Sequence, residues 1–227
     1  MNGRFRILGV VLAVFGLAFV AAGGYAFIRT QDGAKSLQAF SAAQNVKLTY
    51  DDQGRLTDRG TTDGAASIMS LLENDWGYKV DRGELNPNDP LVNTASEYMY
   101  QMATITYHTL HAKVTVTIPK DVEFQGQTIK AGDYDFQNNG KYWTGFDRTN
   151  PIEGAARDKV WTATAHALIG ELGVGASNAS SLQMGLGLAG LFAGLGLVLI
   201  VTGLGVIWAV RPARIKAPAF APVPTPA

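Results

Sequence analysis

Residues 7–28 read ILGVVLAVFGLAFVAAGGYAFI, and residues 184–210 read MGLGLAGLFAGLGLVLIVTGLGVIWAV. Neither stretch contains Asp, Glu, Lys, Arg or His over its 22 or 27 residues. A helix of about 20 apolar residues spans the roughly 30 Å hydrocarbon core of a bilayer. The two stretches therefore predict two transmembrane helices that flank residues 29–183.

The first stretch has a rival interpretation as a cleaved secretory signal peptide. Arg4 and Arg6 precede it, and small residues stand late in it at Ala21, Ala22 and Gly23. The apolar core of a signal peptide is only about 7–15 residues long, however. We therefore expect a retained helix, with cleavage as the alternative.

The basic residues that flank the two stretches predict the orientation. The two chain ends carry five basic and no acidic residues, namely Arg4, Arg6, Arg211, Arg214 and Lys216. Cytoplasmic flanks of membrane helices carry an excess of Lys and Arg, and only Arg29 opposes this trend. We therefore expect a protein of the cell (plasma) membrane whose N-terminal residues 1–6 and proline-rich tail 211–227 are cytoplasmic. Residues 30–183 would then be extracytoplasmic.

The charges of this 227-residue chain are distributed unevenly. The chain has 19 basic and 19 acidic residues, but 13 of the basic and all of the acidic ones lie in 30–183, which gives that segment a net charge of −6. A nucleic-acid-binding protein would show a basic excess. The absence of cysteine excludes a disulfide scaffold, an iron–sulfur cluster and a thiol nucleophile.

Both apolar stretches carry small residues at helical spacing. These are Gly9, Ala13 and Gly16 in the first stretch, and Gly185, Ala189 and Ala193 with the GxxxG pair Gly190 and Gly194 in the second. Small residues let helices approach closely in lipid. We expect these faces to pack on each other or on other integral membrane proteins, although Gly and Ala are also common in membrane helices without such a role.

Residues 30–183 are enough for one domain with its own core. The hydrophobic periodicity predicts helices over 34–46, 65–72 and 91–111, and a last helix that starts at Asn150-Pro151. Alternating residues predict strands over 46–50 and 114–118, followed by an antiparallel meander with turns at 125–126, 131–133 and 138–140. The Gly, Ser and Asn residues over 173–181 predict a flexible hinge. The predicted fold class is thus an α+β membrane protein, with two transmembrane helices around helices and a small antiparallel sheet.

The three histidines are the first candidates for chemistry. His108 and His111 are spaced i,i+3 on the predicted helix 91–111, Glu97 lies on the same polar stripe, and His166 could reach them from the last helix. Imidazole and carboxylate ligands suit zinc, and imidazole also suits copper. The alternatives are a solvated polar face with no cofactor, which is our expectation, and a pH-sensitive histidine cluster.

Aromatic residues are more abundant than histidines in the outer segment. Tyr142 and Trp143 beside the Asn-Asn-Gly turn are candidates for a patch that faces a partner or a glycan, because Tyr and Trp combine large contact area with a polar group. Packing in the core is the alternative for most aromatic residues. The hydrolase and phosphate-binding motifs GxSxG, HExxH and GxxxxGK[ST] do not occur.

Three stretches carry a resemblance to a known group. They are ILGVVLAVFGLAFVAAGG at 7–24, ENDWGYKVDRGELNPNDPLVNTASEYMYQMATI at 73–105, and the Gly-Leu pairs of 184–210. In these the chain resembles small actinobacterial two-span membrane proteins of unknown function, some of which carry a label as aromatic ring-opening dioxygenase. The resemblance implies an N-terminal span, an outer domain and a C-terminal span. It implies no catalytic residues, and the iron ligand set of a dioxygenase is not recognisable here.

These patterns together predict a non-enzymatic membrane protein of the cell envelope. We expect an accessory or scaffolding subunit of a membrane complex that contacts the lipid bilayer and other integral membrane proteins, and no nucleic acid. The alternatives are an extracytoplasmic metal-binding or sensing domain that uses His108 and His111, and a homo-oligomeric pore.

Overall fold

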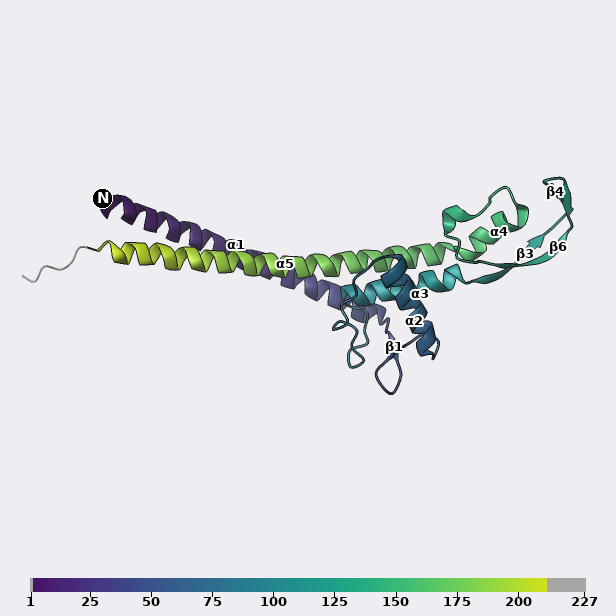
Figure 1. Ribbon diagram of the computed structural model, residues 1–227, viewed down its shortest axis with the longest axis horizontal. Coiled ribbons are helices and arrows are strands. Elements are labelled where there is room, and N and C mark those ends of the chain that lie inside the picture. The colour runs from purple at the N-terminus through teal and green to yellow at the C-terminus, as the bar shows by residue number, and fades with distance from the viewer. Residues whose placement is uncertain (1, 212–227) are drawn as a thin grey trace, which may run out of the picture. The chain divides into compact units, whose positions relative to one another are not determined.

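The computed structural model describes residues 2–211 of the chain (Figure 1). These residues form two compact units: unit 1 comprises residues 2–30 and 185–211, and unit 2 comprises residues 31–184. Two long helices, α1 (Asn2–Gln44) and α5 (Ala163–Ala209), contribute residues to both units. The predicted proline-rich tail from residue 212 on, with Arg214 and Lys216, lies outside the described residues.

The remaining elements all belong to unit 2. They are β1 (Thr49–Tyr50), β2 (Leu56–Thr57), α2 (Thr62–Ser70), the π-helical turn η1 (Leu71–Asp75), α3 (Ala95–Leu110), β3 (Lys113–Ile118), β4 (Val122–Phe124), β5 (Gln127–Ile129), β6 (Gly132–Gln137), the 3-10 turn η2 (Trp143–Gly145) and α4 (Pro151–Val160). The predicted combination of helices with antiparallel β-structure is confirmed, in a chain that is rich in helix and has small antiparallel sheets. Helices α1 and α5 are both long and apolar enough to cross a membrane.

Unit 1 is an antiparallel pair of helices whose backbones touch. A Cβ atom added at Gly16 would lie 2.7 Å from the carbonyl oxygen of Gly196, and one at Gly9 would lie 2.7 Å from that of Gly203. A Cβ atom at Gly23 would lie 2.8 Å from the carbonyl oxygen of Ala189. Real Cβ atoms do not approach backbone oxygens so closely, and therefore these positions hold the helices together only as glycine. We call this line of contacts the glycine seam.

The seam repeats every seven residues on both helices. Its buried positions are Gly9, Gly16 and Gly23 on α1, and Ala189, Gly196 and Gly203 on α5. A seven-residue repeat keeps one helix face toward its partner in a left-handed coiled coil. Only some of the small residues predicted to pack therefore lie at the contact between α1 and α5.

The small residues that the sequence singled out fall into two groups. The first group lies at the contact in unit 1. On α1 it comprises Gly9, Gly16 and Ala13, which faces Gly203. On α5, Ala189 and Ala193 lie against Gly23, and Gly185 lies against Thr30. In contrast, a Cβ atom at Gly190 or Gly194 would meet nothing within 4 Å. The GxxxG pair is not part of this contact, because Gly190 lies about 100° around the helix from Ala189, and Gly194 about 160° from Gly196.

Unit 2 is built around a tyrosine of α3 whose side chain contacts both α1 and α5. The Tyr98 hydroxyl on α3 lies 2.7 Å from the Ser41 hydroxyl on α1, in a buried hydrogen bond. A Cβ atom at Gly175 of α5 would lie 2.5 Å from the Tyr98 ring, so the ring rests directly on this glycine. The surrounding core contains Leu72, Ala103 and Leu172.

The predicted flexible hinge over 173–181 is wrong. Helix α5 runs without a break from Ala163 to Ala209, and α4 ends before it at Val160. Leu172, Ala176 and Ala179 are buried at helical spacing against the core of unit 2. This packing compensates for the weak helix propensity of the Gly, Ser and Asn residues.

Helix α3 begins four residues later than the sequence indicates. Its N-cap is Thr94, and Thr94 and Glu97 form a reciprocal capping box. The Glu97 carboxylate accepts hydrogen bonds from the backbone N–H groups of Asn93 (3.0 Å) and Thr94 (2.9 Å). Glu97 is only 1% exposed, and this burial raises the pKa of its carboxyl. The predicted placement of Glu97 on a polar face is therefore wrong. The N-cap of α2 is Thr61.

The strands form three separate two-stranded antiparallel sheets, not a meander. Strand β3 pairs with β6, and the hairpin of β4 and β5 is inserted between them in sequence. The predicted turn at Gln125-Gly126 joins β4 to β5, and both of its residues have positive φ. The Asn-Asn-Gly segment 138–140 does not join strands; it folds onto the end of α3.

The glycine seam predicts a sharp difference between two neighbouring glycines. Gly196→Ala should lower the free energy of unfolding of the detergent-solubilised protein by about 1–3 kcal/mol, because the new methyl group forces the helices apart. Gly194→Ala, two residues away in open space, should change it little. Denaturant titration of both variants measures the difference, and equal effects would contradict the seam.

The buried Glu97 predicts a pH dependence of stability. Because burial raises its pKa above the ordinary 4.5 in the folded state, the folded protein binds this proton more tightly than the unfolded chain does. The resulting stabilisation is fully present below pH 4.5 and is lost as pH rises through the folded pKa. Glu97→Gln keeps an acceptor for the cap but cannot titrate.

Denaturant titrations of wild type and Glu97→Gln at several pH values test this point. The stability of wild type relative to the variant should increase as the pH is lowered through this range. A difference that does not vary with pH would show that Glu97 keeps an unshifted pKa.

Candidate functional site

Three segments of unit 2 enclose a cleft of about 690 Å³. They are the end of α2 with η1, the end of α3, and the loop 138–142. We call this the aromatic cleft; it is lined by Ser67, Ser70, Leu71, Asp75, Trp76, Tyr107, Leu110, His111, Gly140 and Tyr142. Its volume lies within the range of about 300–1,000 Å³ that is typical of small-molecule pockets.

The π-helical turn η1 brings the first wall into place. Helix α2 continues into η1, where the Trp76 N–H donates to the Leu71 carbonyl five residues back, over 3.1 Å. The extra residue of a π turn rotates the following side chains around the helix axis, and such turns occur often at functional sites. Gly77, at φ +66°, then ends the helix. Asp75 and Trp76 thereby both line the cleft.

Asn138 holds the opposite wall. It is fully buried, and its side-chain amide donates to the carbonyls of Thr109 (2.8 Å) and Lys141 (3.1 Å) while its oxygen accepts from the Lys141 N–H (3.0 Å). The Gly140 N–H donates to the Leu110 carbonyl over 3.0 Å. The loop thus satisfies carbonyls that the last turn of α3 leaves open, and it fixes the position of Tyr142.

The two walls meet through aromatic side chains. The Trp76 indole N–H donates to the Tyr142 hydroxyl over 2.9 Å. On its other side Tyr142 stacks on Trp161, with the ring centroids 5.8 Å apart and the planes 28° from parallel. Tyr142 is nevertheless exposed, so its ring is available to a ligand or partner.

His111 supplies the polar edge of the cleft. Its ring packs on Tyr107 with centroids 4.3 Å apart, and its Nδ1 lies 2.8 Å from the Tyr107 carbonyl oxygen. A carbonyl can only accept, so Nδ1 carries the proton and the Nε2 lone pair of the neutral ring is left as an acceptor. Among the described residues, no hydrogen bond joins His111 to Ser67 or Ser70. The arrangement therefore offers aromatic faces and hydrogen-bonding groups but no assembled nucleophile and base.

The structure does not bring the predicted metal ligands together. His108 Nε2 lies 3.0 Å from Asp58 Oδ1, whereas His111 lines the cleft. His166 packs edge-on against Trp143, with centroids 5.0 Å apart, and Glu97 caps the far end of α3. Within residues 2–211 no group of three or more His, Asp and Glu could hold a metal ion.

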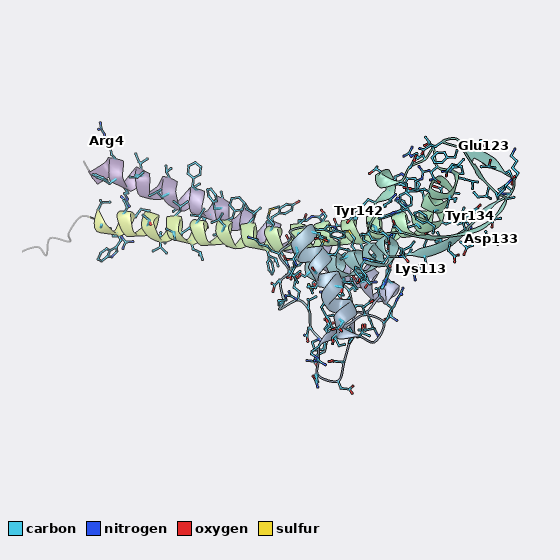
Figure 2. All side chains as sticks on the ribbon, turned by 45° about the vertical axis from the view of Figure 1, so that its right-hand side comes forward. Arg4, Lys113, Glu123, Asp133, Tyr134 and Tyr142 are labelled. Carbon is cyan, nitrogen blue, oxygen red and sulfur yellow. The ribbon has the colours of Figure 1, made fainter. Side chains whose placement is uncertain are left out.

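The two residues of the predicted patch, Tyr142 and Trp143, also lie in different surroundings. Only Tyr142 lines the cleft, whereas the Trp143 ring lies under the Arg157 guanidinium at 4.0 Å and against His166. Tyr134 of β6 lies well apart from Tyr142 (Figure 2). The sequence therefore pointed to two residues of the cleft, His111 and Tyr142, under two unrelated hypotheses. It missed Asp75 and the role of Asn138, because a π turn and a buried loop amide leave no pattern in the sequence.

A second set of buried polar groups lies in unit 2 away from the cleft. Burial raises the pKa of Tyr50 to about 12, helped by the negative charge of Glu97, and burial also raises the pKa of Tyr100. The hydroxyls of both tyrosines have no hydrogen-bond partner among the described residues. At neutral pH these phenols are uncharged, as their surroundings require.

Asn138 predicts a selective loss of stability. Asn138→Ala should lower the free energy of unfolding by about 1–3 kcal/mol, because it leaves buried backbone groups of Thr109 and Lys141 unpaired. Its neighbour Asn139 is exposed, and Asn139→Ala should be nearly neutral. Thermal unfolding of the two variants in detergent distinguishes them, and an equal response would mean that Asn138 does not hold the loop.

No family model matches this chain, and no curated protein and no solved structure matches it either. The resemblance to the actinobacterial two-span proteins therefore stays a prediction. The features of the chain that bear most on its function are the apolar surface of unit 1 and the aromatic cleft of unit 2.

Proposed function

We propose that this chain is a non-enzymatic integral membrane protein of the cell envelope, an accessory or scaffolding subunit of a membrane complex. In this proposal α1 and α5 cross the membrane, both termini are cytoplasmic, and the acidic segment 30–183 is outside the cell. The aromatic cleft is the surface that engages the partner.

The exposed apolar surface of unit 1 carries the membrane part of the proposal. The most apolar 18-residue windows of α1 and α5 are only 17% and 11% buried, whereas the core helix of a water-soluble protein is mostly buried. The seam holds glycine and alanine, and the large side chains, such as Phe15, Leu197 and Val201, are exposed on the outer faces. An apolar surface of this extent is stable in lipid and not in water.

The glycine seam also favours a retained first helix. Gly9, Gly16 and Gly23 are buried only because α5 covers them. Cleavage of α1 as a signal peptide would expose Gly196 and Gly203 of α5 and leave that helix without its partner. The basic residues Arg4 and Arg6 before the first apolar stretch support a cytoplasmic N-terminus.

The aromatic cleft supports a binding role over a catalytic one. It has exposed Tyr142, a tryptophan held by a hydrogen bond, and polar groups at its edge. Tyr and Trp are enriched among the residues that contribute most to protein–protein binding. The metal-binding and pore alternatives stay predictions, and no particular observation favours them.

Purification in mild detergent tests this role. We expect a stoichiometric membrane-protein partner to co-purify with wild type, and Tyr142→Ala to reduce its yield severalfold, because the ring is part of the contact. Asn139→Ala, an exposed change on the same loop outside the cleft, should leave the yield unchanged. A chain that purifies alone or only as a homo-oligomer would contradict the accessory role.

Cysteine labelling provides the control for topology. The chain contains no cysteine, so Lys120→Cys and Arg4→Cys each introduce a single reactive site. In intact cells a membrane-impermeant maleimide should label the first variant and not the second. Labelling of both sites only after cell lysis would overturn the proposed orientation independently of the partner.

A further inference from the structure

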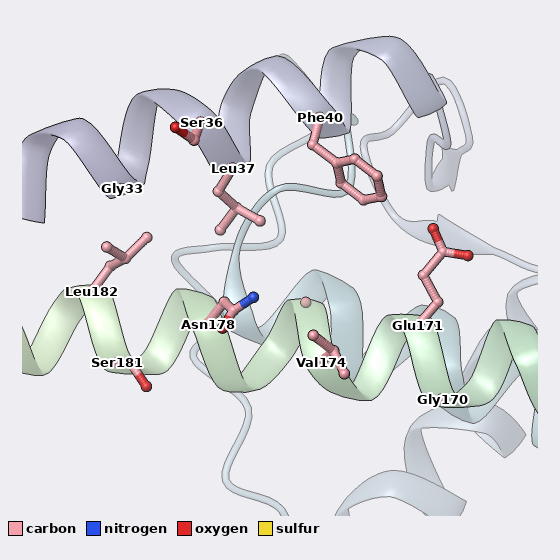
Figure 3. Close-up of a pocket in the computed structure, with 11 residues that line it drawn as sticks. Gly33, Ser36, Leu37, Phe40, Gly170, Glu171, Val174, Asn178, Ser181 and Leu182 are labelled. Carbon is pink, nitrogen blue, oxygen red and sulfur yellow. The ribbon is translucent and has the colours of Figure 1, made fainter.

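An apolar groove lies between α1 and α5 within unit 2 (Figure 3). Its volume is about 690 Å³. It is lined by residues 33–40 of α1 and 170–182 of α5, namely Gly33, Ser36, Leu37, Phe40, Gly170, Glu171, Val174, Gly175, Asn178, Ser181 and Leu182. This groove shares no residue with the aromatic cleft.

The groove exists because Tyr98 keeps the two helices apart. In unit 1 the helices touch through glycine backbones. In unit 2 the Tyr98 ring lies between Ser41 of α1 and Gly175 of α5, resting on the glycine and hydrogen-bonded to the serine. Side chains of α1 and α5 therefore leave a groove between the two helices.

The walls of the groove are mostly apolar, as a hydrocarbon chain requires, with the Asn178 amide as a polar group among them. Ser36 and Ser181 each donate a hydrogen bond to a carbonyl of their own helix, at 3.1 Å and 2.8 Å, so neither presents an unpaired donor. Phe40 and Val174 are 47% and 61% exposed on the rim. Glu171, the one charged residue among the described lining residues, lies at one end and accepts a hydrogen bond from Gln44.

The dimensions and the place of the groove along the helices select the occupant. From Gly170 to Leu182 helix α5 rises by about 18 Å, and one leaflet of a hydrocarbon core, the length of one acyl chain, is about 15 Å. Along the sequence, the uncharged end of the groove is the end nearer to the apolar runs: Gly33 follows Ile28 by five residues, and Leu182 precedes Met184 by two.

We infer that this groove binds an acyl chain of a phospholipid from the surrounding bilayer. The inference rests on the proposed membrane insertion of α1 and α5. The acyl chain enters the groove at the uncharged end, beside Gly33 and Leu182, and Phe40 and Val174 cover the bound acyl chain. Binding removes apolar rim surface from water, which is the driving force.

Fluorescence quenching by brominated lipids tests this inference. The cysteine-free chain allows one environment-sensitive fluorophore at a time, at Asn178→Cys in the groove, at Ser180→Cys outside it, or at Leu195→Cys in the apolar run. Positions 178 and 180 differ by only about 3 Å along the axis but by about 200° around it. Each labelled protein is reconstituted into phosphatidylcholine vesicles with brominated or unbrominated acyl chains.

We expect strong quenching at 195 and severalfold stronger quenching at 178 than at 180. Equal quenching at 178 and 180, with 195 quenched, would overturn the groove while leaving membrane insertion intact. An unquenched 195 would overturn both, because the helices would then not be in lipid.

A groove-filling variant separates acyl-chain binding from a local effect of the label. Val174→Phe, at an exposed position on the rim, adds bulk without entering the core. It should lower the quenching at 178 to the level at 180 and leave the quenching at 195 unchanged. Unchanged quenching at 178 in this variant would also overturn the inference.

Discussion

Backbone contact between α1 and α5 is the constraint on which unit 1 depends. At Gly9, Gly16 and Gly23 the partner's backbone lies where a Cβ atom would be. In the bilayer proposed for these helices the hydrophobic effect would not drive them together, so close van der Waals packing would have to do so. The seam supplies that packing by placing small residues inside and large ones outside, the reverse of a water-soluble helix pair.

The same two helices meet a different constraint in unit 2. There Tyr98 occupies the space between Ser41 and Gly175, so contact through backbone is replaced by contact through an aromatic ring. In unit 1 no side chain separates the two backbones, whereas in unit 2 the bulky Tyr98 side chain does. This one difference in size produces both the core of unit 2 and an apolar groove. Gly175 therefore acts as the seam glycines do, by leaving room for a close contact, although its contact is with Tyr98 of a third helix.

Polar groups at the ends of α3 organise the remainder of unit 2. Thr94 and Glu97 satisfy its first N–H groups, and Asn138 and Gly140 satisfy its last carbonyls. The second of these arrangements also fixes Tyr142 against Trp76. The aromatic cleft is thus a consequence of helix capping: the loop is held in place because the last carbonyls of α3 need hydrogen-bond donors.

The sequence by itself determined the two long apolar helices, the Asn150 cap before α4, the turn at 125–126 and the combination of helices with antiparallel strands, because each depends on local composition or period. It did not determine the seven-residue seam, the unbroken α5 or the burial of Glu97. Those depend on which residue of a distant element stands opposite, as Gly196 does for Gly16 and Tyr98 for Gly175. A single helix shows several stripes of small residues, and only its partner decides which stripe is buried.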